Sequence, residues 1–129
     1  MTGTTVITNR VRPILDDEYA DGNASQRWTD AILLAWLNDG QRLVADLRPE
    51  SLLSAAYTMT TYADLAAIGS TSVLPDRYQE ALVDYVCARA LNEDAQDERD
   101  LNRAESHFKQ FVIKSGIPSQ INLVRGRGA

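Results

Sequence analysis

Apolar residues recur at helical spacing in four separate stretches of this chain, and this pattern predicts a mainly helical fold. The first stretch runs from about Thr4 to Leu15 and carries its apolar residues in helical register: Ile7, Val11, Ile14 and Leu15. Thr4 or Thr5 offers a hydroxyl that suits the start of a helix. Pro13 lacks a backbone donor and crowds the preceding turn, so we expect this helix to bend or end around Arg12.

The second and strongest helical pattern spans about Arg27 to Leu47. It predicts a wide apolar face made of one stripe and the residues on or beside it: Trp28, Ile32, Ala35, Trp36, Leu33, Leu37, Val44 and Leu47. Ser25 is placed to cap the helix, and Arg48 ends it because the residue before a proline is driven out of helical geometry. The preceding stretch, Asp16 to Gln26, is acidic and contains Asp21-Gly22-Asn23, which predicts a solvated loop.

The region from Ser51 to Leu74 follows a different pattern. Tyr57 to Tyr62 is a β-prone run, and Gly69 to Ser72 has the composition of a turn. We therefore expect a short strand or an irregular insert. The competing interpretation is a helix through Leu52 to Ile68, which the alanines favour.

A third helix is predicted to open at Pro75, in the first-turn position that proline prefers, and to run to about Ala95. Its apolar side consists of Tyr78, Leu82, Tyr85, Val86 and Leu91. After an acidic turn, a fourth helix carries a narrow apolar stripe of Leu101, Ala104, Phe108, Phe111 and Val112. Ser115-Gly116 ends that helix. The third and fourth helices are therefore expected to lie antiparallel.

The 129 residues, 44% of them apolar, are enough for one folded domain. The predicted fold class is mainly α: a single four-helix bundle-like domain with a short β or irregular insert and an extended C-terminal tail. We place the helical domain at residues 1–116 and the tail at residues 117–129, because no helical period explains the residues after Gly116.

The charge of the chain narrows the function classes. A formal net charge of −5 argues against a dedicated nucleic-acid binder, since phosphate neutralisation needs a surplus of basic residues on one face. The N-terminus lacks the pattern of an export signal, and no apolar run approaches the roughly 20 residues needed to cross a bilayer. The single cysteine, Cys87, lies in an apolar helical stretch and is expected to be a core residue of a protein from a reducing compartment.

Catalysis finds little support in the residue types. The one histidine, His107, is expected to be solvated or at an interface, and a site formed with Cys87 would still need an orienting group. The carboxylates from Glu93 to Asp100 do not form the glycine-containing loop of a calcium site. Gly126 and Gly128 precede no helix that could bind phosphate. We therefore expect no catalytic residue, no metal and no cofactor.

Three segments resemble the head-to-tail connector, or adaptor, proteins of tailed bacteriophages. They are Arg10-Val11-Arg12 with Ile14-Leu15-Asp16-Asp17, then RWTDAILLAWLNDGQRLVADLRPES from Arg27 to Ser51, and LPDRYQEALVDYVCARALNEDA from Leu74 to Ala95. The helix through Asn102, Ala104, Phe108 and Phe111 belongs to the same arrangement. The segment between Ser51 and Leu74 departs from it, being shorter and more alanine-rich than the β-containing insert of similar proteins.

The resemblance implies a structural virion protein at the head-tail interface, assembled in the host cytoplasm and without enzymatic activity. It implies a homo-oligomeric ring, commonly of twelve subunits, that docks on the portal protein and extends the DNA channel toward a tail-side stopper or tail-completion protein. DNA would pass without specific binding, and no membrane is involved. The tail is expected to bind the portal or a neighbouring subunit through Ile117, Ile121, Leu123, Val124, Arg125 and Arg127.

Two other functions remain open at this stage. The alternative is a helical DNA-binding accessory protein of phage packaging or regulation, in which Arg10, Arg12, Arg125 and Arg127 would contact phosphate. A helical-bundle enzyme has less support and would need an unexpected metal or cofactor.

Overall fold

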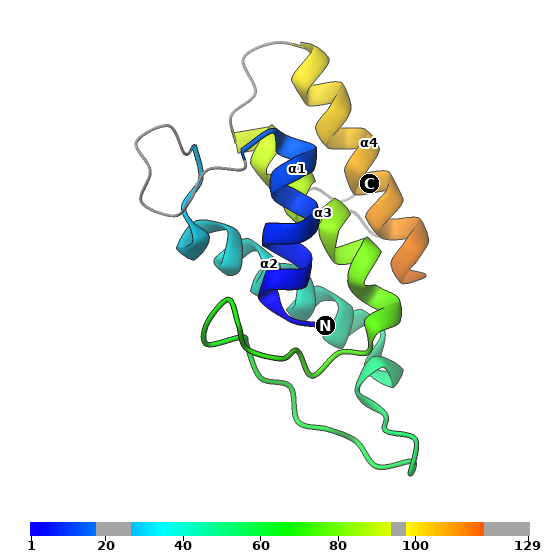
Figure 1. Cartoon of the computed structure of the whole chain (residues 1–129). Helices are drawn as coiled ribbons and strands as arrows, with labels where there is room; N and C mark the ends of the chain where they lie inside the picture. Colours follow the sequence, from blue (N-terminus) through cyan, green and yellow to red (C-terminus); the bar gives the residue numbers. More distant parts are fainter. Residues whose placement is uncertain (18–26, 94–97, 118–129) are drawn as a thin grey trace.

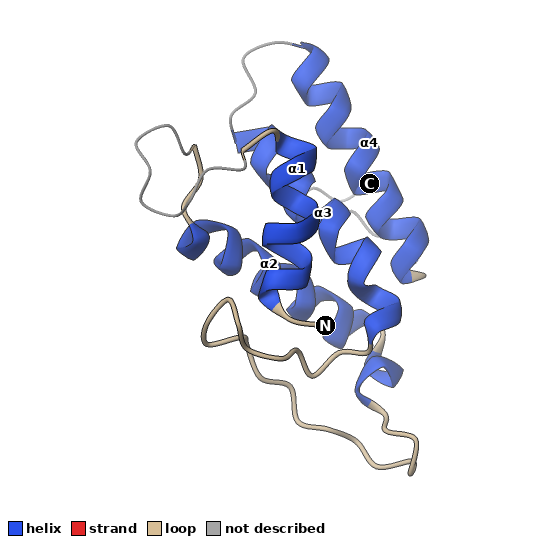
Figure 2. Cartoon of the chain, viewed as in Figure 1, coloured by secondary structure: helices blue, strands red, loops and turns tan. Residues whose placement is uncertain are grey.

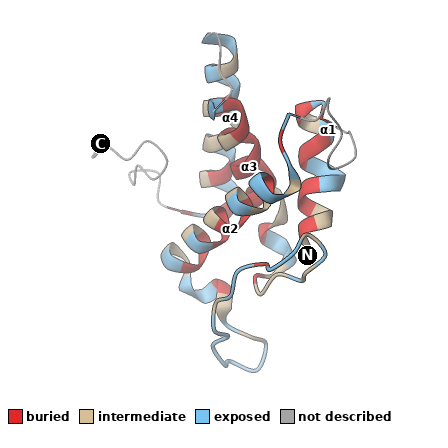
Figure 3. Cartoon of the chain, turned by 90° about the vertical axis from the view of Figure 1, so that its left-hand side faces the viewer, coloured by how far each residue is buried: buried red, intermediate tan, exposed pale blue. Residues whose placement is uncertain are grey.

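Helix α3 (Gln79–Glu93) forms the centre of the fold and contacts each of the other helices. Every residue from Ala81 to Leu91 except Arg89 is buried, as the red ribbon in Figure 3 shows. The predicted apolar side of this helix is confirmed, but burial extends to nearly all of its faces. Helix α3 is therefore surrounded by the other elements of the fold.

The computed structural model describes residues 1–17, 27–93 and 98–117. Around α3 it places a π-helical segment η1 (Thr4–Val11), helices α1 (Arg12–Leu15), α2 (Asp30–Leu47) and α4 (Glu98–Ser115), and two short 3₁₀ turns, η2 (Pro49–Leu52) and η3 (Asp76–Tyr78). Helix α4 runs antiparallel beside α3 (Figure 1). The predicted mainly α fold is confirmed: Figure 2 shows helices and loops, and the described residues contain two isolated β-bridges but no strand.

The N-terminal helix continues through Pro13 to Leu15 and does not end at Arg12. Its winding changes there instead, because the backbone N–H of Arg12 bonds the carbonyl of Ile7 and Pro13 lies in the first turn of α1, where no donor is needed. The capping hydroxyl comes from Thr2, which accepts the N–H of Thr5 at 3.1 Å while Thr5 Oγ1 accepts the N–H of Thr2 at 2.9 Å.

Helix α2 begins at Asp30, three residues later than predicted, and Thr29 caps it by accepting the N–H of Ile32 at 3.3 Å. The predicted cap, Ser25, lies outside the described residues. The predicted end before Pro49 is confirmed.

The stripe of α2 that faces the core was predicted incorrectly in part. Trp28 is buried but precedes the helix, and both Ile32 and Ala35 are exposed. The buried side instead consists of Leu33, Leu37, Asn38, Gly40, Gln41, Val44 and Ala45. Gly40 allows the close approach of α3, since a Cβ at this position would lie 2.7 Å from a ring carbon of Tyr85.

Residues 51–74 form an irregular insert, as the first of the two alternatives predicted, and not a helix. Leu53 pairs with Met59 across a tight turn, and Thr71 pairs with Thr2 near the N-terminus. The N-terminal residues and the end of the insert are further joined by a 2.7 Å bond from Thr4 N–H to the Ile68 carbonyl.

Helix α4 packs on α3 through Ala104 and Phe111, whose ring centroid lies 5.0 Å from that of Tyr85. Phe108 and Val112 are half-buried, but Leu101, predicted in the same stripe, is 49% exposed. The helix ends at Ser115 as predicted, and Gly116 takes the left-handed conformation with φ of 74°. Ile117 then returns to the core and is 4% exposed.

Candidate assembly surfaces

Arg12 and Asp17 form a buried ion pair that joins the N-terminal helix to the start of α2. Arg12 Nη1 lies 2.9 Å from Asp17 Oδ2 and also donates to the carbonyl of Trp28, while Nη2 lies 2.6 Å from Asp30 Oδ1. Asp17 in turn accepts the backbone N–H groups of Arg27 and Trp28 at 3.0 and 3.3 Å. This pair brings the two ends of the 18–26 segment together.

The burial of this pair corrects two expectations. Asp17 was expected in a solvated loop but is fully buried. Arg12 was a candidate phosphate contact of the DNA-binding alternative, and it is 4% exposed with its donors already used. Arg10 is exposed but forms an ion pair with Glu80 on α3.

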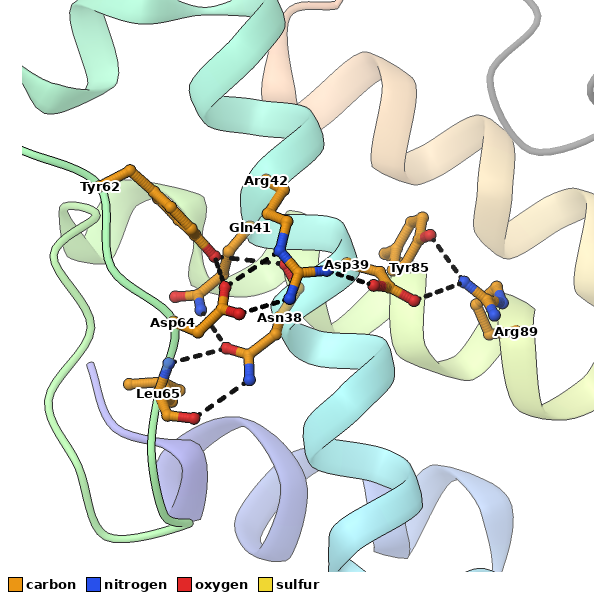
Figure 4. Close-up of polar contacts among 9 residues, drawn as sticks. All are labelled: Asn38, Asp39, Gln41, Arg42, Tyr62, Asp64, Leu65, Tyr85 and Arg89. Carbon is orange, nitrogen blue, oxygen red and sulfur yellow. Dashed lines mark hydrogen bonds and ion pairs between the residues drawn. The ribbon is translucent and has the colours of Figure 1, made fainter.

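The insert is held against α2 by Asn38, which is buried. Its side-chain amide donates to the Leu65 carbonyl at 3.1 Å, and its Oδ1 accepts the Leu65 N–H at 2.8 Å, so one side chain satisfies both backbone groups of a buried residue (Figure 4). Gln41 donates to the same Oδ1 at 3.0 Å and accepts a hydrogen bond from Ser72. The network therefore fixes two points of the insert.

An exposed set of charges lies outside this buried clamp. Arg42 pairs with Asp64 of the insert and with Asp39 on its own helix, and the hydroxyl of Tyr62 donates to Asp64 Oδ1 at 2.6 Å (Figure 4). Burial raises the pKa of Tyr62 well above its usual range, and the hydrogen bond to Asp64 adds to this effect. Tyr62 therefore stays protonated and acts as a donor at neutral pH.

The turn of the insert presents apolar side chains to solvent. Leu53 and Met59, which pair across the turn, are 41% and 57% exposed, and Tyr57 at the tip is 86% exposed. In the described part of the chain, the other large exposed apolar residues are Ile32, Leu101 and Ile113. Sequence reasoning identified the β-prone run but not its exposure, although the absence of any charge between Ser51 and Ala63 was the available signal.

His107 of α4 is half-buried and contacts the carboxylate of Asp84 on α3. Its Nδ1 lies 2.8 Å from Asp84 Oδ1, and Lys114 Nζ lies 2.7 Å from the other oxygen of this carboxylate, so two side chains of α4 bind one carboxylate of α3. Cys87 is buried in the core as predicted, and burial raises the pKa of its thiol to about 12. Within residues 1–17, 27–93 and 98–117, no cluster of three or more His, Cys, Asp or Glu side chains is placed to hold a metal ion.

The Asp84 cluster makes stability depend on pH. Burial of Asp84 raises its pKa, but the hydrogen bonds from His107 and Lys114 outweigh this and leave the pKa below its usual value. A depressed carboxylate pKa stabilises the fold at neutral pH, and this contribution is lost as the pH falls through the folded-state pKa. We expect Asp84→Asn to lower the free energy of unfolding by about 1.5–3 kcal/mol at pH 7, in line with lost hydrogen bonds to a charged group.

Urea unfolding at a series of pH values from 7 to 3 measures this effect. The difference in the free energy of unfolding between wild type and Asp84→Asn should become steadily smaller as the pH falls. Asp46→Asn removes the same charge from an exposed position of α2 and serves as the control. Its free energy of unfolding should differ little from that of wild type at every pH. A difference in the free energy of unfolding between wild type and Asp84→Asn that does not change with pH would contradict the role of the Asp84 charge.

The structure places only one of the six predicted tail-binding residues. Ile117 packs into the core of its own chain and is therefore not available as an anchor for another subunit. Ile121, Leu123, Val124, Arg125 and Arg127 lie outside the described residues. No helix among the described residues is long and apolar enough to cross a membrane.

The fold and these surfaces define a mainly helical protein with apolar side chains exposed at the turn of its insert. A protein-family model described as SU10 adaptor protein matches residues 53–128, from the turn of the insert through α3 and α4 into the tail. Because this match covers more than half of the chain, the chain belongs to the SU10 adaptor protein family of phage head-tail adaptors. Neither the curated proteins nor the solved structures include a significant match.

Family membership confirms the resemblance to phage adaptors. The matched region includes Leu74 to Ala95, the third of the segments that carried the resemblance, and the fourth helix. The protein is therefore a structural adaptor of a phage and a component of the virion neck.

Proposed function

We propose that this chain forms a homo-oligomeric ring, of twelve subunits, that docks on the portal protein and extends the DNA channel toward the tail. The single observation that carries the proposal is the match of the adaptor family over residues 53–128. The partner on the other side of the ring is a tail-side stopper or tail-completion protein. In this role the chain is a spacer and a docking platform, and it performs no chemistry.

The charge of the chain supports passage of DNA without specific binding. The formal net charge is −5, and an acidic surface repels the phosphate backbone, so DNA would not be retained as it passes. Arg12 cannot contact phosphate, because it is buried and paired with Asp17. These two features favour the adaptor over the DNA-binding accessory protein.

The C-terminal residues are proposed to bind the portal or a neighbouring subunit. Ile121, Leu123 and Val124 supply apolar side chains, and Arg125 and Arg127 supply the charge for an acidic surface. Among the described residues, Ile117 is the last that packs into the core, so we place the binding segment after it.

A chain that ends at Ile117 tests this proposal. We expect it to keep its helical content and its thermal unfolding midpoint, because it retains every core residue that the structure describes, and to lose co-purification with portal by at least tenfold. Ile113→Ser, an exposed change on α4, is the matched control and should bind portal normally. Undiminished portal binding by the truncated chain would refute the role of the tail.

A salt-dependent gel shift addresses the alternative function. The adaptor is expected to show little affinity for free duplex at any salt concentration. Tight binding that weakens steeply with salt would instead support the DNA-binding accessory protein. Electron microscopy of the full-length chain mixed with portal tests for the ring itself.

A further inference from the structure

The described residues leave two separate apolar surfaces uncovered, one at the turn of the insert and one on the first half of α2. The turn surface consists of Leu53, Tyr57 and Met59, all exposed. Tyrosine with so little of its ring covered is typical of a residue that is buried when a partner binds, since its large rigid side chain loses little entropy on contact. The turn surface is therefore the part of the insert that we expect to contact another protein.

The second surface, here called the α2 surface, consists of Ala31, Ile32, Ala35 and Trp36. These positions lie on one side of the helix because they are spaced one, three and four residues apart. Both alanines and Ile32 are exposed, and Trp36 is half-buried with the guanidinium of Arg89 over its ring at 5.7 Å.

The two surfaces cannot meet within one chain. Leu53 follows the C-terminal end of α2, whereas Ile32 lies in its first turn, and the helix between them is roughly 25 Å long at 1.5 Å per residue. Figure 1 shows the turn of the insert extending beyond the end of α2 that is opposite to Asp30. Covering both surfaces therefore requires another molecule, and a second copy of this chain supplies a complement to each.

We propose that the turn surface of one subunit docks on the α2 surface of the next copy of this chain. Neither segment contributes a charged side chain of its own: no Asp, Glu, Lys or Arg occurs from Ser51 to Ala63 or from Ala31 to Trp36. The guanidinium of Arg89 lies beside the Trp36 ring, but it is already paired with Asp39, so docking would not bury an unpaired ion, which would cost several kcal/mol. The inference rests on the proposed function, because two different surfaces joined head to tail generate a ring when the rotation closes.

The fold holds the turn surface in shape before any contact forms. Ser54 N–H donates to the Thr58 carbonyl at 2.8 Å, and Ser54 Oγ accepts the N–H groups of Ala56 and Thr58 at 3.3 and 3.2 Å. Tyr57 takes the left-handed conformation, with φ of 61°, which projects its ring from the tip. A preformed turn loses less conformational entropy on docking.

The exposed apolar residues of α4 do not offer an equivalent surface. Leu101 and Ile113 are twelve residues apart, and each lies next to polar or charged side chains, such as Asn102 and Lys114. Single exposed apolar residues are ordinary on a protein surface. The α2 surface is contiguous, which is why we assign it as the acceptor.

Paired cysteines test the contact in the full-length chain assembled with portal. Tyr57→Cys and Ile32→Cys are combined in one variant and treated with a short bismaleimide. The native Cys87 does not interfere because it is fully buried and its thiol pKa is raised to about 12. We expect a ladder of dimers, trimers and larger species on a denaturing gel, because each subunit links to two neighbours. Each single variant should remain monomeric on that gel.

Other occupants of the turn surface give different results, and each would overturn the inference. Dimers from Tyr57→Cys alone would mean that two turns contact each other. A ladder from Tyr57→Cys with Leu123→Cys, and none with Ile32→Cys, would mean that the tail occupies the turn surface. Rings visible by electron microscopy without any ladder would reject this contact but leave the proposed function intact, whereas the absence of rings from wild type would reject the proposed function.

Discussion

Replacing Arg12 by alanine is expected to lower the free energy of unfolding by about 3–5 kcal/mol, because it leaves a buried carboxylate without its charge partner. Asp17 is fully buried, and its remaining partners are two backbone N–H groups. The substitution also leaves the carbonyl of Trp28 without the guanidinium that now donates to it. Folded proteins are typically stable by only about 5–15 kcal/mol, so this loss is a large fraction of the total free energy of unfolding.

Arg10 provides the matched control, since it lies two residues away and also forms an ion pair. The side chains of Arg10 and Glu80 are 44% and 45% exposed, so water replaces the interaction and Arg10→Ala should cost about 0–1 kcal/mol. Urea unfolding followed by circular dichroism compares the two variants. If Arg10→Ala and Arg12→Ala lowered the free energy of unfolding equally, burial would not determine how much each ion pair contributes to stability.

Helices and their ends were the part of the fold that the sequence predicted best. Apolar periodicity located all four helices, and Pro49 and Gly116 marked the ends of α2 and α4 through rules that act on the local backbone. Of the two outcomes predicted for Pro13, the end of the helix at Arg12 does not occur; the helix passes from π-helical to α-helical winding there, because Pro13 lies in the first turn of α1.

Which face of a helix is buried depends on its neighbours and could not be predicted as well. In α2 the stripe containing Ile32 is as apolar as the one containing Leu33 and Leu37, and the positions of α3, η1 and the insert decide which of them is buried. Leu101 was predicted to be buried because it follows the stripe of α4, but it lies in the first turn of that helix, away from Phe111. The buried ion pair of Arg12 with Asp17 could not be predicted either, because charged residues are normally exposed to solvent.

The candidate surfaces were predicted only where composition reveals them. An uncharged β-prone run pointed to the insert, but neither the exposure of Tyr57 nor the attachment of Leu65 to Asn38 could be predicted from it. The role of Asn38 could not be predicted from the sequence, since an asparagine in the middle of a helix can bond the nearby backbone or simply face solvent. Its role depends on contact with a residue 27 positions away.

Asn38→Ala is expected to destabilise the domain by about 2–5 kcal/mol and to release the insert from α2. The substitution leaves both the N–H and the carbonyl of Leu65 unpaired, and each buried unsatisfied group costs about 1–3 kcal/mol. Leu65 is 4% exposed, so water cannot easily replace the lost partner. Limited proteolysis should then cut the insert between Leu53 and Tyr62 faster than in wild type, well below the urea concentration of global unfolding.

Arg42→Ala separates this buried clamp from the exposed charges that join the same two elements. The side chains of Arg42 and Asp64 are 50% and 38% exposed, so solvent and salt screen their attraction, and the unfolding midpoint should change little. Proteolysis of the insert should also stay near the wild-type rate. If Arg42→Ala instead released the insert and Asn38→Ala did not, surface charge would position the turn surface, and ring assembly would become sensitive to salt.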